Sequence, residues 1–243
     1  MLKEFIAHIQ KTTQPLVCEI GGSTFAIDGN GIAREIRPEI SHPDTLTLHS
    51  LEALVKLVKT EAVNMDTPLY ITVPDHLTVR CFGQPQPDAR FFRQVYYEVE
   101  ATGVPGFRDG FREQEKAIIE LRSNFVPSDG TDYLLDFLSR IDKNSSVMTK
   151  DNGVSQTVEA RRGVALRDVM PIKPRVALRP FRTFQEVEQP ESEFLLRLNE
   201  NGEVGLFEAD GGMWKLKARQ TVKAFLEAEL ESLVSSEAVY VAL

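Results

Sequence analysis

Residues 175–214 read RVALRPFRTFQEVEQPESEFLLRLNENGEVGLFEADGGMW and contain the clearest strand pattern in the chain. Between 194 and 198, apolar side chains recur at every second position, as one face of a half-buried strand requires. Turn-forming residues follow at 199–202, and the alternation resumes at 204–208. This order of alternation, turn and alternation predicts a β-hairpin.

Two shorter stretches upstream, 176–178 and 184–188, show the same alternation. Pro180 and Pro190 separate these stretches from each other and from the hairpin, and proline suits a strand end because it removes a ladder donor. The segment therefore predicts roughly four antiparallel strands within about forty residues.

The rest of the chain adds strands and helices around this segment. Hairpins are predicted at 16–27 and 69–82, and a long strand at 91–100 carries apolar residues on both faces. Apolar residues spaced three or four apart predict a short helix within 1–10 and longer helices at 50–60, 112–125, 131–141 and 219–233. These patterns predict an α+β fold, with a mainly antiparallel sheet of roughly seven or more strands and roughly three to four helices packed on it.

The length of 243 residues allows one large domain or two small ones. We expect a single α+β domain over 1–243. The polar segment 143–150 suggests an alternative division into lobes 1–142 and 151–243 that share one core.

The composition limits the classes of function and the cellular compartments that fit the chain. The chain has 36 acidic and 28 basic residues, and a net charge of −8 disfavours general binding to nucleic-acid backbones. Cys18 and Cys81 lie in alternating apolar runs and are read as buried thiols, which fits a reducing compartment. No apolar run is long enough to span a membrane and no secretory signal is visible, so we expect a cytoplasmic protein.

The motifs of common enzyme chemistry are missing from the sequence. It has no Gly-Lys pair for a phosphate-binding loop, no CxxC or HExxH metal motif, and no GxSxG around a nucleophilic serine. We therefore expect no catalytic residue, no cofactor and no metal site, and the balance favours a protein that is not an enzyme. His76, next to Asp75 in a turn, is read as structural.

Two glutamates are the remaining candidates for catalysis. In an extended strand, Glu186 and Glu188 would point to the same face about 6–7 Å apart, close enough to share a metal or divide acid and base roles. Two glutamates on a solvent-facing strand are also what solubility alone would select. A metal-dependent hydrolase is therefore the least favoured of three alternatives.

Residues near the central hairpin are the candidates for binding a ligand or partner. Trp214 follows two glycines and could stack on a ligand or seal the end of the core. The full set of candidates is Arg179, Arg182, Phe184, Glu186, Glu188 and Trp214. A local nucleic-acid groove would combine Arg161, Arg162, Arg167, Arg179, Arg182, Phe181 and Trp214.

The predicted long strand suggests self-association. Apolar residues on both faces of 91–100 need a cover on each face, and the helices within the chain can cover one. A symmetric homo-oligomer, most simply a dimer, would cover the other. Phe92 and Tyr96 are the candidate interface residues.

The chain also resembles hypothetical proteins of tailed phages and prophages, and more distantly the prophage YfdQ-like family. The resemblance rests on RPFRTF at 179–184, EVEQPES at 186–192, LFEADGG at 206–212 and NGVSQ at 152–156. The family has a more arginine-rich strand pair where this chain has 194–198, and it supplies no activity to transfer.

The resemblance implies a phage-encoded accessory protein acting in the host cytoplasm. On this hypothesis the protein self-associates and binds a host or phage macromolecule, with counter-defence as one such role. The alternative is a nucleic-acid-handling protein of phage recombination or replication. The second alternative is the hydrolase based on the paired glutamates.

Overall fold

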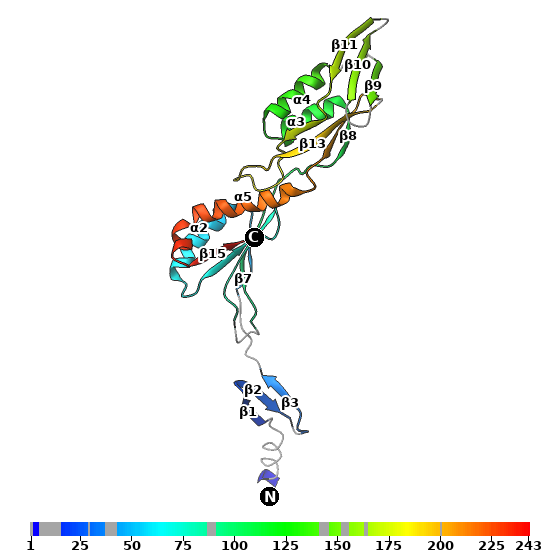
Figure 1. The fold of residues 1–243 in the computed structure, drawn as a ribbon. Coiled ribbons are helices and arrows are strands. Elements are labelled where there is room, and N and C mark those ends of the chain that lie inside the picture. Colours follow the sequence, from blue (N-terminus) through cyan, green and yellow to red (C-terminus); the bar gives the residue numbers. More distant parts are fainter. Residues whose placement is uncertain are drawn as a thin grey trace. The chain divides into compact units, whose positions relative to one another are not determined.

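The computed structural model describes residues 2–4, 16–28, 30–36, 43–86, 91–140, 146–151, 156–162, 165–199 and 201–243, with the backbone alone described between 146 and 171. The chain divides into two compact units, Met1–Pro43 and Asp44–Leu243. Figure 1 shows its helices and strands. An α+β fold is confirmed.

The first unit contains a three-stranded antiparallel sheet. Its strands are β1 (Leu16–Ile20), β2 (Ser23–Ile27) and β3 (Ala33–Ile36), in that order. The predicted hairpin joins β1 and β2, and Gly21 and Gly22 adopt positive φ at its turn. The helix predicted within 1–10 is described only at 2–4, which are helical.

The second unit begins with a mixed five-stranded sheet in the order β15-β5-β6-β7-β4. The outer strands β15 and β4 pair parallel to their neighbours, and the inner pairs are antiparallel. The strand bounds are β4 Leu46–Leu48, β5 Leu69–Thr72, β6 Thr78–Phe82, β7 Val95–Glu100 and β15 Val239–Ala242.

Two long helices pack on one face of this sheet (Figure 1). They are α2 (Leu51–Glu61), which the 3-10 turn Ala62–Asn64 follows, and α5 (Met213–Glu229), which leads into the short α6 (Glu231–Ser235). Their apolar stripes meet the inward residues of the sheet. The central residues of this core are Leu51, Leu54, Val58, Ile71, Val79, Cys81, Val99, Val222 and Leu226.

A second sheet, antiparallel throughout, has the order β12-β13-β14-β8. The predicted hairpin is confirmed as β13 with β14. The bounds are β8 Gly110–Arg112, β12 Arg175–Leu178, β13 Ser192–Leu198 and β14 Val204–Glu208. Helices α3 (Gln114–Asn124) and α4 (Asp129–Arg140) complete its core with Phe125, Leu134, Phe137, Phe194 and Leu196.

A third sheet of this unit has the order β11-β10-β9 and is antiparallel. Its strands are β9 (Ser146–Asp151), β10 (Gln156–Arg162) and β11 (Ala165–Pro171). Arg161 and Arg162 therefore lie on β10 and Arg167 on β11. No helix among the described residues has the length and apolar character needed to cross a bilayer.

The predicted sheet of seven or more strands is wrong, because the largest sheet in the described part of the chain has five. Strand patterns reveal which residues alternate but not which strands pair, and here the strands divide between separate sheets. Strands from both of the predicted lobes, 1–142 and 151–243, also share sheets. Strand β8 pairs with β14 and β5 with β15, so strands from both sides of 143–150 are interleaved.

Two strand predictions are also wrong, one because no strand forms and the other because the strand is shorter than predicted. The predicted strand 184–188 is a turn-containing segment, and the predicted strand 91–100 begins at Val95. Phe91 has a positive φ of 61°, a conformation that interrupts an extended strand. Phe92 forms an isolated bridge with Gln86.

Candidate functional site

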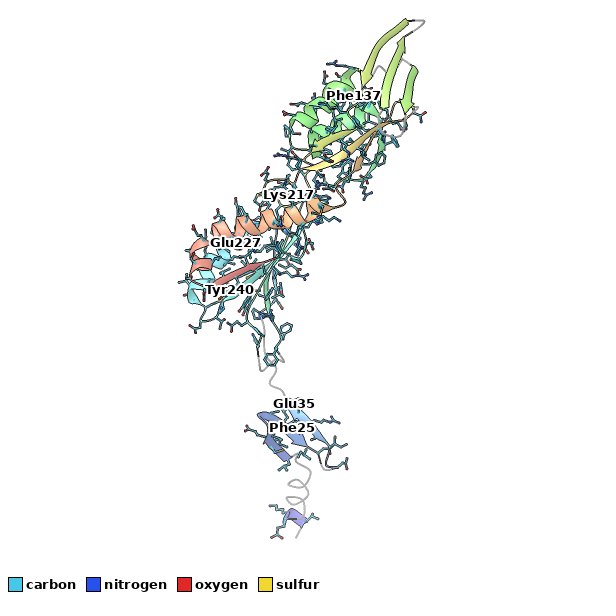
Figure 2. The ribbon with its side chains drawn as sticks, viewed as in Figure 1. Phe25, Glu35, Phe137, Lys217, Glu227 and Tyr240 are labelled. Carbon is cyan, nitrogen blue, oxygen red and sulfur yellow. The ribbon has the colours of Figure 1, made fainter. Side chains whose placement is uncertain are left out.

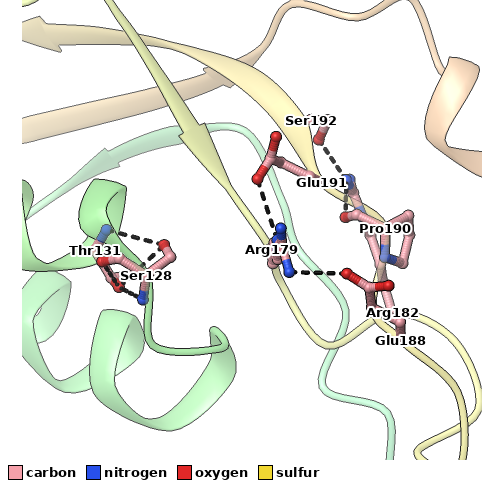
Figure 3. A network of polar contacts seen from close by, with 8 residues as sticks. All are labelled: Ser128, Thr131, Arg179, Arg182, Glu188, Pro190, Glu191 and Ser192. Atoms are coloured by element: carbon pink, nitrogen blue, oxygen red, sulfur yellow. Dashed lines mark hydrogen bonds and ion pairs between the residues drawn. The ribbon is translucent and has the colours of Figure 1, made fainter.

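Arg182, which lies in the segment between β12 and β13, makes several polar contacts with its side chain. Its side chain is buried, and one guanidinium nitrogen donates to Glu208 Oε1 at 2.6 Å. The other terminal nitrogen donates to Ser192 Oγ and to the Pro190 carbonyl oxygen (Figure 3). Burial lowers the pKa of Arg182 to about 10 while Glu208 and Asp210 oppose that shift, so the group stays charged at neutral pH.

Trp214 completes this cluster from the first turn of α5. The Arg182 guanidinium carbon lies 4.0 Å from the centroid of the Trp214 ring, and the indole Nε1 donates to Glu208 Oε2 at 3.1 Å. Asp210 positions the tryptophan, because its carboxylate accepts from the backbone N–H groups of Gly212 and Trp214. The predicted candidates Arg182 and Trp214 are therefore in direct contact.

His76, from the turn between β5 and β6, also reaches this cluster. Its ring meets the Trp214 ring edge-on at 4.8 Å between centroids. Thr183 Oγ1 donates to the His76 carbonyl oxygen at 2.6 Å. Burial lowers the pKa of His76, Lys215 and Arg182 lower it further, and Asp75 opposes them, so the ring is neutral at pH 7.

The segment that carries Arg182 is held in shape by one buried amide. Gln189 Oε1 accepts from the backbone N–H groups of Arg182 and Thr183. Gln189 Nε2 donates to the carbonyl oxygens of Phe184 and Val187. These four bonds satisfy backbone groups that a strand would have paired with a neighbour, which explains why 184–188 is not a strand. Phe184 itself is a core residue and is only 1% exposed.

The paired-glutamate geometry predicted for catalysis is wrong, because it required an extended strand at 184–188. Glu186 Oε1 accepts from the backbone N–H of Leu51 at 2.8 Å, at the N-terminus of α2. Glu188 instead pairs with Arg179, whose guanidinium also binds Glu191 (Figure 3). The described residues contain no group of three or more His, Cys, Asp or Glu side chains arranged to hold a metal ion.

These contacts also bear on the predicted nucleic-acid groove. Arg182 is 2% exposed and bound to Glu208, so it cannot reach a phosphate. Arg179 is more accessible but already neutralised by two carboxylates. The side chains of Arg161, Arg162 and Arg167 lie outside the described part of the structure.

An open groove of ≈ 570 Å³ lies beside the Arg182 cluster. One wall comes from β12 and the start of β13, and the other from the turn before α5 and the first two turns of that helix. Its lining residues are Ala177, Glu191, Ser192, Glu193, Asp210, Met213, Trp214, Leu216, Lys217 and Gln220. The sequence reasoning identified only Trp214 of this set as a candidate for binding.

The lining of the groove combines exposed apolar side chains with three carboxylates, those of Glu191, Glu193 and Asp210. Met213 and Leu216 are 64% and 41% exposed, although both are large apolar side chains. Glu191 and Glu193 are bound to arginines outside the groove lining, Arg179 and Arg175 respectively. The residues Met213, Leu216 and Gln220 recur at helical spacing, and this spacing was the one signal from which the groove wall could have been predicted.

The predicted interface residues Phe92 and Tyr96 differ in their surroundings. Phe92 is 50% exposed. Tyr96 is half-buried, packs against the core of the five-stranded sheet, and lies so close to Gly83 that a Cβ there would touch its ring. Tyr96 is therefore less suited to a docking surface than Phe92.

An aromatic row crosses three strands of the same sheet. Tyr70 stacks on Phe82 and on Tyr240 with centroids 6.0 and 5.4 Å apart. Arg93 lies over the rings of Tyr70 and Phe82, at 4.9 and 5.5 Å from their centroids. These ring faces are in contact with a guanidinium of the same chain, which is typical of cross-strand stabilisation.

Comparison of the chain with protein-family models, with curated proteins and with solved structures returns no match. The resemblance to phage proteins and to the YfdQ-like family stays a prediction.

Proposed function

We propose that the protein is a self-associating, non-enzymatic binding protein that takes a segment of another protein into the groove beside α5. One observation carries this proposal. The groove exposes Met213 and Leu216 next to the hydrogen-bonded cluster of Arg182, Trp214 and Glu208. Exposed apolar side chains in a concave site beside a fixed aromatic residue are typical of protein-docking sites.

The charges of the groove define the kind of segment that fits. Glu191, Glu193 and Asp210 line it against the single cation Lys217. The ion pairs of Glu191 and Glu193 are solvent-exposed, and such pairs contribute about 0–1 kcal/mol, so cations of a partner can replace their arginines. The favoured ligand is a segment with an apolar anchor flanked by lysine or arginine.

The sequence resemblance supports an infected host cell as the place where the protein binds its partner. A chain that resembles phage and prophage proteins would meet its partner in an infected host cell, where counter-defence is one role for such binding. The net charge of −8 favours a partner with a basic surface.

The test compares two variants that each place one charge on an exposed helix. Leu216→Asp alters the groove on α5, and Ile119→Asp is the matched control on α3, where Ile119 is 59% exposed. Tagged full-length wild type and both variants are used as bait, and the proteins that copurify are identified by mass spectrometry. We expect Leu216→Asp to lose the wild-type partner and Ile119→Asp to keep it.

A synthetic peptide from the identified partner then measures the affinity directly. We expect Leu216→Asp to weaken binding at least about tenfold, the equivalent of 1.4 kcal/mol. A partner that both variants retain equally would contradict the proposal, as would a wild type that copurifies with no protein.

A further inference from the structure

The end of the hairpin formed by β6 and β7 exposes two phenylalanines. Phe91 is 70% exposed and Phe92 is 50% exposed. The backbone of Gln86 accepts from the Phe91 N–H and donates to the Phe92 carbonyl oxygen, both at 2.9 Å. Phe91 has a φ of 61°, which a bulky residue adopts only where its surroundings impose it. Two large rings are therefore held in water by a defined backbone conformation.

The described residues of this hairpin end, 83–86 and 91–94, carry a positive charge. Arg93 is the one charged residue among them, and it is exposed. In the sequence, residues 87–90 carry one acidic and one basic residue, whose charges cancel. Arg93 Nη1 donates to the Gly83 carbonyl oxygen at 3.2 Å, and a guanidinium has further N–H donors for a carboxylate. The two phenylalanines and Arg93, here named the hairpin tip, thus join an apolar anchor to a cation.

The groove beside α5 has the complementary character. Met213 and Leu216 expose apolar surface there, and a methionine thioether makes favourable contacts with aromatic rings. The lining sets three carboxylates against one cation, Lys217, which lies on α5 (Figure 2). Its volume of ≈ 570 Å³ lies within the range of about 300–1,000 Å³ that is typical of ligand sites. The groove therefore fits an apolar anchor that carries a cation, which is the chemistry of the hairpin tip.

The hairpin tip and the groove lie at opposite ends of β6. His76, in the turn before β6, contacts Trp214 of the groove lining. The tip follows the other end of the strand, and Thr78–Phe82 alone span about 16 Å of extended chain. The hairpin continues beyond β6, since the Gly83 N–H donates to the Gln94 carbonyl oxygen. A tip cannot enter the groove of its own chain, so a second copy has to supply it.

We propose that the hairpin tip of one copy docks in the groove beside α5 of a second copy. The two phenylalanines contact Met213 and Leu216, and Arg93 binds a carboxylate of the lining. This inference rests on the proposed function, because it assigns an occupant to the groove proposed there. The contact joins two different surfaces, so it continues from copy to copy and builds rings or open chains. A captured partner and a second copy compete for the same groove.

The size of the tip sets the expected strength. A buried aromatic side chain covers about 150–250 Å², so two of them cover less than the about 800 Å² that each partner of a standard stable interface contributes. Contacts below the standard size are typical of transient encounters. We therefore expect self-association that depends on concentration, with a dissociation constant in the micromolar range or weaker.

The test compares single charges placed on the tip, in the groove and elsewhere. Phe91→Asp alters the tip, and aspartate adopts positive φ more readily than phenylalanine. Leu216→Asp alters the groove, and Val63→Asp is the matched control at a position that is 76% exposed and belongs to neither surface. Circular dichroism checks that each full-length variant is folded.

Sedimentation velocity from about 1 to about 500 μM measures the association of each protein alone. We expect the average mass of wild type and of the Val63→Asp control to rise with concentration. The tip variant and the groove variant are each expected to need at least about tenfold more protein for the same rise.

Mixing the tip variant with the groove variant tests the pairing directly. The groove variant keeps an intact tip, and the tip variant keeps an intact groove, so one complementary contact remains. We expect the mixture to form a dimer that neither variant forms alone at that concentration. No larger species is expected, because the remaining tip and the remaining groove both carry the blocking aspartate.

Three results would overturn the inference. A wild type that stays monomeric at the highest concentration would exclude the contact, while partner capture by the groove could still succeed. Equal behaviour of Phe91→Asp and Val63→Asp would exclude the tip, and a mixture that stays monomeric where wild type associates would place the interface elsewhere. A wild type that associates as expected but captures no other protein would contradict the proposed function and leave the contact between tip and groove standing.

Discussion

The Arg182 guanidinium carbon lies 4.0 Å from the ring centroid of Trp214, and both side chains bind the carboxylate of Glu208. Arg182 comes from the segment between β12 and β13, whereas Trp214 comes from the first turn of α5. A charged group that is 2% exposed is tolerated here because each terminal nitrogen has a partner. This contact fixes one wall of the groove beside α5.

Arg182→Met is predicted to lower the free energy of unfolding by about 3 kcal/mol, because it leaves the Glu208 carboxylate and Ser192 without their buried cation. Urea unfolding followed by Trp214 fluorescence measures this loss. Arg179→Met is the control. Its exposed pairs with Glu188 and Glu191 predict a change within about 1 kcal/mol.

Equal losses in the two variants would contradict the assignment of Arg182 as the structural centre of the cluster. In that case the arginine would contribute through its aliphatic stem alone, and the polar contacts to Glu208 and Pro190 would carry little free energy.

Alternation in the sequence was sufficient to predict much of this region. The hairpin of β13 and β14 was predicted because its polar turn interrupts a regular period of two. Arg182 was identified as a candidate because it belongs to a cluster of arginines just before the hairpin, and Trp214 because it follows the glycine turn at 211–212.

The contacts of Glu186 and Gln189 could not be predicted in the same way. Glu186 binds the backbone of Leu51, which lies 135 residues away, and no local pattern encodes such a contact. The side chain of Gln189 forms hydrogen bonds with backbone groups that a neighbouring strand would otherwise bind. Apolar and polar residues therefore alternate around Gln189 without forming a strand. The groove was missed because its walls come from β12, β13 and α5, which only the tertiary fold brings together.

The ring of His76 is predicted to make stability depend on pH. Burial against Trp214 lowers its pKa from the ordinary 6.5, so the unfolded chain takes up a proton first as the pH falls. This contribution to stability is complete above about pH 6.5 and is lost as the pH falls toward the folded pKa. Asp75, Lys215 and Arg182 are the charged groups that act on the ring.

His76→Gln removes this dependence and leaves the carboxylates unchanged. The difference in unfolding free energy between pH about 7.5 and about 5.5 is expected to be smaller in the variant than in wild type. The Thr183 bond to the His76 backbone remains in both proteins. An identical pH dependence in the two proteins would show that the ring titrates as it does in water.

Replacing Glu186 by alanine is predicted to lower the free energy of unfolding more than replacing Glu188 by alanine. Glu186→Ala removes a carboxylate from the N-terminus of α2 and is expected to cost about 1 kcal/mol. Glu188→Ala removes half of an exposed ion pair and is expected to cost less than about 0.5 kcal/mol. Thermal or urea unfolding measures both.

The same pair tests the hydrolase alternative. Metal content by elemental analysis is expected to stay unchanged in both variants, because the two carboxylates bind different groups. Loss of a bound divalent metal in either variant would revive the paired-glutamate hypothesis.

Replacing Gly130, in the first turn of α4, by alanine is predicted to destabilise the protein. This is the opposite of the usual effect of replacing a helical glycine by alanine. Replacing a helical glycine by alanine ordinarily stabilises a protein by about 0.5–1 kcal/mol. A Cβ at Gly130, however, would overlap the carbonyl oxygen of Ala177 and press on Val176 of β12. Helix α4 packs directly on this strand, so either the helix moves away or the core of Leu134 and Leu178 opens.

We therefore expect Gly130→Ala to destabilise the protein by about 1–3 kcal/mol, the range for overpacked cores. Ser139→Ala, at the exposed end of the same helix, is the control and should change stability by less than about 0.5 kcal/mol. Because β12 also forms one wall of the groove through Ala177, Gly130→Ala should weaken partner binding as well. A stabilised Gly130→Ala protein would show that α4 does not approach β12 as closely as the structure describes.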